Sequence, residues 1–272
     1  MSAEIANFQT EVYEYYLKHQ RVLPWRIPEP SGSFEPYRIL VSELMLQQTQ
    51  VKRVIPKFTA FMHRFPALQD LAKASLADVL IEWSGLGYNR RARFLHQAAR
   101  QINTEYLGKI PQTVAGLVRL PGIGPNTAAA ILVYSFNQPE VFIETNIRTV
   151  FLHHFFTDQE GVSDQQLLPF IQQALDKRNP RQWYWALMDY GTYLKQTLPN
   201  PSRRSKHHTK QSPFIGSKRF VRGQIMKILT QKATSYQEFC QVIQDDRLRS
   251  VLDDLVREGM ITKDNQVYQL AR

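Results

Sequence analysis

Apolar residues recur at spacings of three and four along most of the chain. In the stretch 36–65 they stand at Ile39, Leu40, Leu44, Val51, Val54, Ile55, Phe58 and Phe61. This spacing places apolar side chains on one face of a helix. The stretch 127–136 is rich in alanine and apolar almost all round, which indicates a central helix. Strand-like alternation is scarce before residue 260, so the pattern predicts a mainly α protein.

The pattern changes after residue 198. Residues 199–216 combine prolines, serines and cations, which is typical of a basic linker. Residues 217–272 then hold three helical patterns and a hairpin signal at Asp264 and Asn265. Three helices and a small hairpin predict a winged-helix-like module, although the same order also fits an inert helical appendage.

The charge balance points to a polyanionic partner. The 272 residues include 34 Lys and Arg against 24 Asp and Glu, a net charge of +10. Nucleic acid is the first expectation and an anionic membrane surface the second, while charge for solubility alone is the alternative. The apolar runs fall short of the ~20 residues of a membrane span, and the N-terminal residues do not read as a secretory signal. We therefore expect a cytoplasmic protein with no membrane partner.

Cysteine and histidine usage argues against a metal site. The single cysteine, Cys240, makes neither an intramolecular disulfide nor a cysteine-based metal cluster. The seven histidines show no metal-ligand spacing. The sequence predicts no bound metal.

The sharpest local motif is "LPGIGPNTAAAIL". Gly122 and Gly124 flank Ile123, and Asn126 and Thr127 open the alanine-rich helix. Glycines let the backbone approach a ligand closely, and a helix N-terminus with free N–H groups favours an anion such as phosphate. The alternative is a simple turn between two helices.

Two glutamates follow apolar residues. Glu43 lies within "ILVSELML", and Glu144 follows "VFI". A buried acid needs a partner or a purpose, because an unpaired buried charge is costly or shifts its pKa. The structural alternatives are an intrahelical ion pair for Glu43, and a helix cap or salt bridge for Glu144.

These motifs together resemble a known superfamily. "LPWR", "SELMLQQTQV", "GLGYNRRARFLH", "LPGIGPNTAAAIL" and "IETNIRTV" occur in the order and approximate spacing of the helix-hairpin-helix, endonuclease III-like DNA glycosylases. Within these the chain most resembles the A/G-specific adenine glycosylases, over roughly residues 8–198. The resemblance implies a glycosylase core over 1–198, with a six-helix lobe at about 30–135 and a second lobe formed by 1–29 plus 136–198.

The resemblance also implies a mechanism. Such enzymes flip a base out of the duplex and use two carboxyls, one to protonate the leaving base and one to face the sugar cation. Glu43 matches the glutamate that protonates adenine. Glu144 stands where the family has an aspartate, and its extra methylene moves the carboxylate by ~1.3 to 1.5 Å. Asn146 is retained from the family pattern and is expected to orient that carboxylate.

Further site residues follow from the same resemblance. Gln47 and Gln48 are expected to wedge into the duplex and read the opposite base, with Tyr88 as a second wedge. Arg91 and Arg93, together with Arg90, are expected to contact phosphates. The remaining predicted DNA contacts are the hairpin residues Gly122, Ile123, Gly124, Asn126 and Thr127. The predicted base pocket comprises Trp25, Arg26, Leu46, Val51 and Trp185.

The chain departs from the family pattern at several points. Asn126 replaces the lysine with which bifunctional relatives cleave the strand, which predicts a monofunctional glycosylase. The four cysteines that hold an iron–sulfur cluster in most relatives are missing, so no cofactor is expected. Residues 215–272 are too short for the relatives' domain that reads 8-oxoguanine. Trp185 stands where some adenine enzymes place a carboxylate or amide to read adenine.

The expected function is excision of adenine opposite 8-oxoguanine or guanine. The protein would act as a monomer on mismatched or damaged duplex DNA, in the cytoplasm at a prokaryotic nucleoid. One alternative is a glycosylase for mismatched thymine or uracil. The other is a catalytically silent protein that binds distorted DNA, for which Glu43 would be dispensable.

Overall fold

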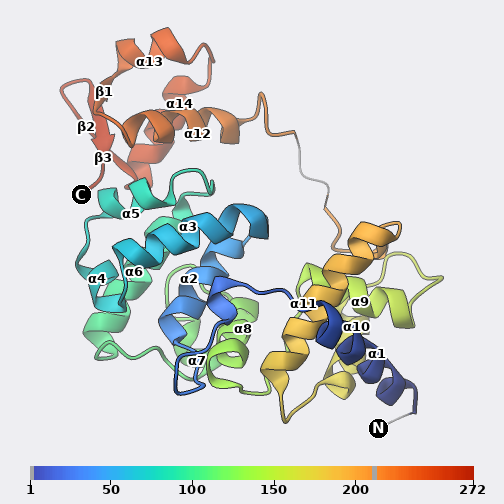
Figure 1. Ribbon diagram of the computed structural model, residues 1–272. Coiled ribbons are helices and arrows are strands. Elements are labelled where there is room, and N and C mark those ends of the chain that lie inside the picture. Colours follow the sequence, from blue (N-terminus) through green and yellow to red (C-terminus); the bar gives the residue numbers. More distant parts are fainter. Residues whose placement is uncertain (1–2, 210–212) are drawn as a thin grey trace. The chain divides into compact units, whose positions relative to one another are not determined.

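The computed structural model describes residues 3–209 and 213–272 (Figure 1). Residues 1–2 of the predicted core and 210–212 of the predicted linker lie outside the described residues. The prediction of a mainly α protein is confirmed. In the two described ranges, the helices are too short or too polar to cross a membrane.

The chain forms two compact units. The first unit comprises Met1–Ile39, Gln112–Val118 and Ile123–Lys210, and the second comprises Leu40–Pro111, Arg119–Gly122 and Gln211–Arg272. These divisions differ from the predicted boundaries, because the alanine-rich helix belongs to the first unit and the C-terminal module to the second. The helix α2 (Pro36–Leu46) begins in the first unit and continues into the second.

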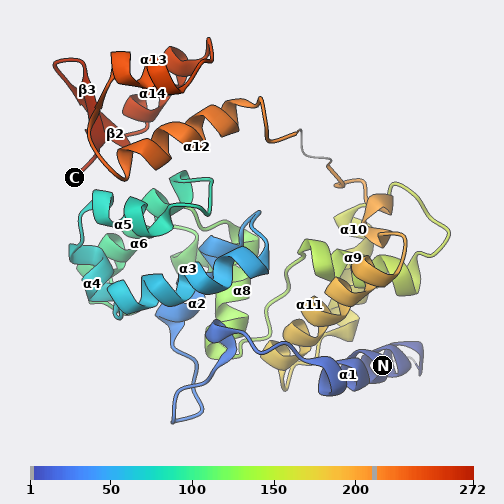
Figure 2. The ribbon, with the colours of Figure 1, turned by 45° about the horizontal axis from the view of Figure 1, so that its top comes forward.

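Helices packed on the long α11 make up most of the first unit (Figures 1 and 2). Its core is aromatic: Phe8 meets the ring of Trp183 edge-on, with 5.7 Å between ring centroids, and Trp183 is fully buried. Such pairs add to the stabilisation that burial gives. The elements of this unit are α1 (Ala3–His19), η1 (Pro24–Arg26), α7 (Val114–Leu117), α8 (Pro125–Phe136), α9 (Thr145–Phe155), α10 (Asp164–Ala174), α11 (Pro180–Thr197) and η2 (Pro201–Arg204).

Trp83 is a centre of packing in the second unit. It is fully buried at the end of α5, meets Phe61 edge-on, and donates its indole N–H to the Gly87 carbonyl at 3.2 Å. The core therefore extends to the turn that precedes α6. The helices around it are α3 (Val51–Arg64), α4 (Leu68–Lys73), α5 (Leu76–Trp83) and α6 (Arg90–Glu105).

The C-terminal module has the element order of a winged helix. Three antiparallel strands in the order β1-β3-β2 accompany three helices, and Ser235 and Glu238 form the capping box that begins the second helix. The predicted three helices and hairpin are confirmed, and β1 adds a third strand. The elements are α12 (Lys218–Leu229), β1 (Thr234–Ser235), α13 (Tyr236–Val242), α14 (Leu248–Arg257), β2 (Ile261–Asp264) and β3 (Val267–Leu270).

In the first unit, α9 and α11 approach each other closely at Gly191. A Cβ added to Gly191 would lie 2.4 Å from the backbone oxygen of Asn146. Glycine in the middle of a helix usually costs about 0.5–1 kcal/mol relative to alanine. We infer that this cost is tolerated because only glycine lets the N-terminal turn of α9, which carries Asn146, rest on α11.

We predict that Gly191→Ala destabilises the protein by about 1 to 3 kcal/mol, the usual cost of overpacking a core. Gly223→Ala is the matched control, because its Cβ would meet only the Phe214 ring, at 3.9 Å. Since Gly223 lies in the middle of α12, this control should leave stability unchanged or raise it by about 0.5–1 kcal/mol. Urea unfolding of both variants measures the difference, and equal effects would contradict the close approach.

Candidate functional site

Glu144 is the N-cap residue of α9, but its carboxylate does not cap the helix. No backbone N–H of the first turn donates to its side chain. Arg148, one turn further on, directs its guanidinium to Asp164 through two 2.7 Å contacts. Among the described residues, no ion pair includes Glu144. The cap and salt bridge that would explain Glu144 structurally are therefore not formed.

The surroundings of Glu144 disfavour its negative charge. The carboxylate is only partly exposed and follows the buried Phe142 and Ile143. Burial raises the pKa of Glu144 above its ordinary value of 4.5, and the positive charge of Arg148 opposes this only in part. A carboxylate held in this way is stabilised when a cation forms beside it.

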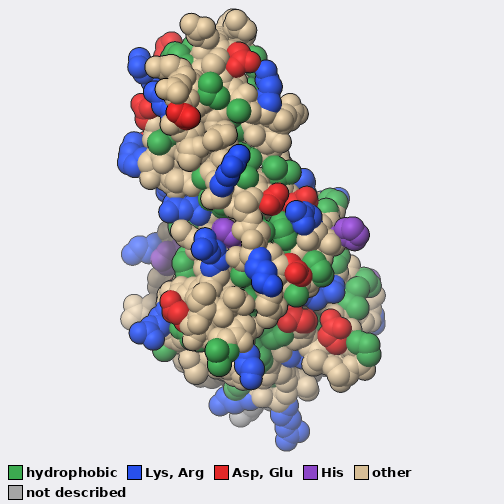
Figure 3. All heavy atoms as spheres, turned by 90° about the vertical axis from the view of Figure 1, so that its left-hand side faces the viewer, with side chains coloured by type: hydrophobic (Ala, Val, Ile, Leu, Met, Phe, Trp, Pro, Cys, Tyr) green, Lys and Arg blue, Asp and Glu red, His purple; other side chains and the backbone are tan. Residues whose placement is uncertain are grey.

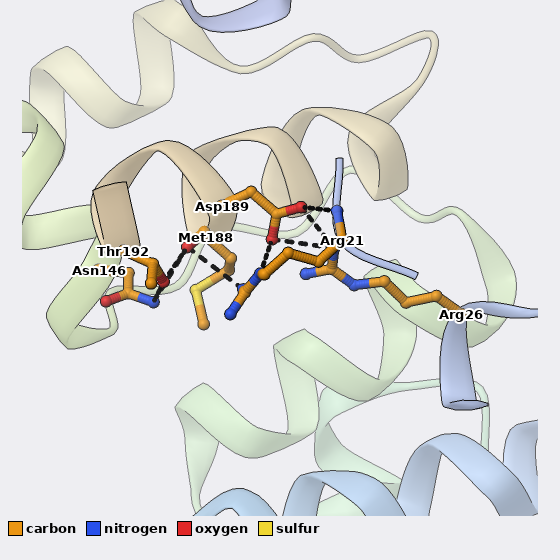
Figure 4. A network of polar contacts seen from close by, with 6 residues as sticks. All are labelled: Arg21, Arg26, Asn146, Met188, Asp189 and Thr192. Carbon is orange, nitrogen blue, oxygen red and sulfur yellow. Dashed lines mark hydrogen bonds and ion pairs between the residues drawn. The ribbon is translucent and has the colours of Figure 1, made fainter. Parts of the chain in front are cut away.

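Asn146 lies two residues beyond Glu144, in the first turn of α9. Its Nδ2 donates to the Met188 carbonyl at 3.1 Å and to the Thr192 hydroxyl oxygen at 3.2 Å (Figure 4). The Met188 carbonyl accepts only, so this contact fixes which end of the amide faces α11. The Oδ1 atom points away from α11 in Figure 4 and has no hydrogen-bond partner among the described residues, although it is buried.

An unpaired buried acceptor costs about 1–3 kcal/mol, so its persistence needs a reason. The Asn146 Oδ1 atom is fixed within two residues of a desolvated carboxylate, at the N-terminus of a helix. A hydrogen-bond donor that arrives there, such as a water molecule or a hydroxyl, would satisfy it. The pair Glu144 and Asn146 is thus arranged to hold a cation and to orient a polar group.

The Asp189 carboxylate organises the segment before η1. It is 2% exposed and accepts from the Arg21 backbone N–H at 2.9 Å and from its Nε at 2.6 Å (Figure 4). Arg26 Nη1 donates to both carboxylate oxygens, at 3.0 and 2.9 Å. Because a buried carboxylate paired with two arginines is fully compensated, Asp189 anchors residues 21–26 to α11. Sequence reasoning missed this acid, although its position in the apolar stretch "WALMDYG" was a signal.

The structure places three of the predicted base-pocket residues in the first unit. Arg26 lies over the Trp185 ring at 5.3 Å, and Trp185 itself packs between Phe34 and Tyr134. Trp25 and Trp185 are 5% and 9% exposed, so each offers little surface to a base. Leu46 and Val51 are partly exposed residues of the second unit. The pocket role of these five residues stays a prediction.

Glu43 lies on α2 in the second unit. It stands between the fully buried Ser42 and Leu44, and its own side chain is partly exposed. The neighbours of Glu43 in the sequence are therefore buried, as the apolar pattern indicated. Its role as an acid stays a prediction.

Arg91 directs its guanidinium into the protein, which argues against the predicted phosphate contact without testing it. It is 7% exposed, and burial lowers its pKa to about 10, so it remains a cation at neutral pH. Its N–H groups are directed inward, to the end of α2 and to the turn before α6. They donate to Leu44 O (2.7 Å), Met45 O (2.8 Å), Gln47 O (2.6 Å), Thr49 Oγ1 (2.9 Å), Gly87 O (3.1 Å) and Tyr88 O (3.4 Å).

Arg91 thereby holds two segments that carry predicted DNA contacts. Gln48 (φ +55°) and Tyr88 (φ +47°) both adopt the left-handed backbone region, which side chains other than glycine rarely enter. Such strain persists only where the surroundings enforce it. Gln48 and Tyr88 are exposed and Gln47 partly so, which suits the predicted wedge role without testing it.

The other two arginines of this motif contact the C-terminal module. Arg90 forms an ion pair with the Glu258 carboxylate, and Arg93 donates to the Glu258 backbone oxygen. Their predicted phosphate contacts remain untested. The competing contact with Glu258 was invisible in the sequence, because more than 160 residues separate the partners.

Gly122 and Gly124 of the hairpin require glycine to different degrees. Gly122 has φ +79°, and a Cβ there would lie 2.7 Å from the Phe94 Cβ, so both conformation and packing require glycine. Gly124 is the N-cap of α8, and a Cβ there would have no atom within 4 Å. Its backbone is therefore open to a close approach. Ile123, in contrast, is 5% exposed and packs inward.

Asn126 connects the start of α8 to the segment that precedes Glu144. Its Nδ2 donates to the Ile143 carbonyl at 3.2 Å, one residue before Glu144. Thr127 follows it in the first turn of α8 and is partly exposed. The predicted DNA contacts of both residues stay predictions. The structure adds that Asn126 positions the peptide which precedes Glu144.

The residues that follow α11 do not fit the cluster of most relatives. One cysteine cannot supply four thiolate ligands, and Cys240 lies on α13, far along the chain. Residues 201–204 instead form η2, where Arg204 donates to the carbonyls of Leu152, Phe156 and Thr157 at the end of α9. A metal-binding group of His, Cys, Asp or Glu side chains was not found within residues 3–209 and 213–272.

We predict that Arg91→Met lowers the free energy of unfolding by about 3 to 5 kcal/mol, because it leaves several buried carbonyls unpaired. The salt dependence of duplex binding should stay the same. Guanidinium unfolding and titrations at several salt concentrations measure both quantities. A salt slope smaller by about 1 with unchanged stability would instead identify Arg91 as a phosphate contact.

We predict that Glu144→Gln raises the free energy of unfolding at pH 7 by about 1 kcal/mol, within the range of other stabilising changes. Because the folded-state pKa of Glu144 is raised, its ionisation destabilises the fold as pH rises above 4.5. The stability gap between variant and wild type should therefore widen with pH above 4.5 and then become constant. Urea unfolding across pH checks this, and a variant less stable than wild type would show that Glu144 is compensated.

Known proteins resemble the chain in sequence and in structure. The family model of the HhH-GPD superfamily base excision DNA repair protein matches residues 41–169. The adenine DNA glycosylase of Buchnera aphidicola subsp. Baizongia pistaciae is 34% identical over 188 residues, which cover 69% of this chain and 52% of that protein. The chain thus spans about half the length of this relative.

Two solved structures share the fold. A thermostable thymine-DNA glycosylase matches with a TM-score of 0.61 at 21% identity, covering 69% of this chain and 86% of that chain. An endonuclease III trapped on DNA as a covalent intermediate matches with a TM-score of 0.54 at 17% identity, covering 78% and 91%. The predicted superfamily is confirmed, and the chain belongs to the HhH-GPD superfamily of base excision DNA repair proteins.

Proposed function

We propose that the protein is a monofunctional DNA glycosylase that hydrolyses the N-glycosidic bond of a mispaired base, most specifically adenine opposite 8-oxoguanine or guanine. The observation that carries this proposal is Glu144, a desolvated carboxylate without an ion-pair partner in the described chain. Its neighbour Asn146 presents a fixed, unpaired acceptor. The similarity to adenine glycosylases supports the choice of adenine.

Glu144 suits the departure of a base from its sugar. The sugar carries positive charge only in the transition state, so a carboxylate without a partner stabilises that state more than the bound substrate. Asn146 Oδ1 accepts a hydrogen bond from the attacking water or from a sugar hydroxyl. Glu43, on the apolar helix α2, protonates the leaving base.

Asn126 argues against strand cleavage. A lyase forms a Schiff base with an amine, and Asn126 offers only an amide that donates to the Ile143 carbonyl. We therefore propose base hydrolysis without strong lyase activity. The chemistry that we propose needs neither a metal nor an organic cofactor.

Duplex DNA is the proposed partner. The α8 N-terminus with the open Gly124 backbone suits a phosphate, and Gln48 and Tyr88 are exposed at strained positions. The net charge of +10 agrees with a polyanion. On the face in Figure 3, however, Lys and Arg are spread among acidic and apolar side chains, so net charge alone marks no binding patch there. We propose that the protein acts as a monomer in the cytoplasm.

Mismatched thymine or uracil is the second candidate substrate. Two observations favour it: the fold likeness to a thymine-DNA glycosylase, and Trp185, packed where the family pattern places an adenine-reading polar group. A catalytically silent DNA-binding protein is the remaining alternative, and it would not need Glu43.

We predict that the protein excises adenine from 8-oxoguanine·A and G·A duplexes, so that alkali then cleaves the strand at that position, and that borohydride traps no adduct. A panel of duplexes with single defined mispairs, including G·T and G·U, measures this. Excision of thymine or uracil with adenine left intact would contradict adenine as the substrate and favour mismatched thymine or uracil.

Glu43→Gln should reduce single-turnover excision at least 100-fold, as loss of general-acid catalysis does, while duplex binding persists. Glu105→Gln is the matched control, since Glu105 is exposed on α6 and its side chain accepts from Gln101. If the wild-type protein excises no base from any duplex of the panel, the catalytically silent DNA-binding protein is favoured.

A further inference from the structure

Glu258, which follows α14 in the C-terminal module, makes polar contacts with α6. Its carboxylate pairs with Arg90 of α6 and with Arg222 of α12, and its backbone oxygen accepts from Arg93. The Glu258 side chain is 14% exposed. Burial raises its pKa, but the hydrogen bonds and charges of Arg90 and Arg222 outweigh burial and hold the pKa below its ordinary value. Glu258 is therefore a charged anchor at neutral pH.

This anchor fixes one face of α12. Arg222 and Arg219 are three residues apart, so they project from neighbouring positions on the same side of the helix. The Ser217 side chain caps the start of α12, which sets the position of its first turn. Arg219 lies in that turn, and its Nη1 donates to the Tyr88 hydroxyl at 3.0 Å.

Tyr88 is consequently held by two arginines from different parts of the second unit. Arg91 donates to its backbone oxygen and lies 5.5 Å from its ring centroid. Arg219 of the module binds the far end of the same side chain. Tyr88 has a left-handed backbone and remains 38% exposed, so it is a strained but accessible residue whose orientation needs support.

We propose that the C-terminal module positions Tyr88 for contact with distorted duplex DNA, and that Arg219 is the positioning residue. This inference rests on the proposed function in so far as Tyr88 meets DNA. The recognition helix of a winged helix, here α14, usually enters the DNA groove, but this α14 directs Asp254 to Lys218 and leads into Glu258. Asp254 thus pairs within the module, whereas Glu258 contacts α6, and in our proposal the module acts on DNA through Tyr88.

The experiment measures binding rather than excision, so it does not depend on the reaction. The full-length protein is titrated with a duplex that contains a tetrahydrofuran abasic-site analogue opposite guanine, and with the intact duplex. The preference for the first duplex reports recognition of distortion. Wild-type excision is measured separately, so failure of the proposed reaction is distinguishable from failure of this inference.

Arg219→Ala should reduce this preference about fivefold, as expected for the loss of one hydrogen bond to an exposed partner. Tyr88→Phe should do the same, and Arg219→Ala should add nothing in the Tyr88→Phe background. Arg249→Ala is the control, because Arg249 is exposed on α14 and packs over the Tyr236 ring within the module. It should leave the preference unchanged.

Two outcomes would overturn the inference. If Arg219→Ala weakens both duplexes equally, lowers the salt slope by about 1 and adds to Tyr88→Phe, Arg219 is itself a phosphate contact. If Arg219→Ala leaves the preference for the abasic-site duplex unchanged, the module does not act through Tyr88.

The Glu258→Gln variant gives a second, independent test of the inference. It keeps the side-chain shape but removes the charge that Arg90 and Arg222 bind, so it should lower the preference as Arg219→Ala does. Arg219→Ala should then have no further effect in the Glu258→Gln background. A full fivefold effect of Arg219→Ala in that background would show that the anchor does not position Arg219, which contradicts the inference.

Discussion

The buried Arg91 guanidinium is the interaction on which the proposed DNA-reading surface depends. A helix ends with carbonyls that have no partner within the helix, and α2 leaves such carbonyls at Leu44 and Met45. A planar cation with five N–H groups satisfies them and also meets the negative end of the helix dipole. No carboxylate is among the hydrogen-bond acceptors of Arg91 in the described structure; backbone and hydroxyl oxygens offset its desolvation. The Arg91 side chain therefore holds both the loop at 46–50 and the turn at 85–88 through hydrogen bonds.

The first unit, in contrast, holds the Glu144 carboxylate without an ion-pair partner among the described residues. Asp189 is buried and pairs with two arginines, whereas Arg148 pairs with Asp164 and the partly exposed Glu144 has no ion-pair partner in the described chain. Gly191 lets α9 rest on α11, and Met188 and Thr192 then fix the Asn146 amide. The structural acid and the candidate catalytic acid are thus distinguished by their partners.

Much of this could be predicted from the sequence, and the failures have physical reasons. Helical spacing and the Ser235 capping box are local signals, and they predicted the elements well. The glycine motif indicated a backbone that only glycine adopts readily, and Gly122 does have a positive φ with Phe94 beside it, whereas the approach to a ligand stays a prediction. The inward direction of Arg91 is also a periodic signal, because its spacing from Leu95 and Ala98, four and seven residues, places it on the buried face of α6. The contacts of Gly191, Asp189, Arg219 and Glu258 join residues distant in sequence, so no local pattern revealed them.

Hydrogen exchange of backbone amides tests most directly whether one cation holds both DNA-reading segments. In wild type, the Thr49 N–H donates to Leu46 O and the Leu86 N–H to Trp83 O, each at 3.1 Å. Lysine keeps the charge at position 91 but cannot reach all the carbonyls at once. The account predicts that Arg91→Lys speeds exchange at Thr49 and Leu86 together, by about tenfold or more, with α14 unchanged. Faster exchange in only one of the two segments, or in neither, would contradict it.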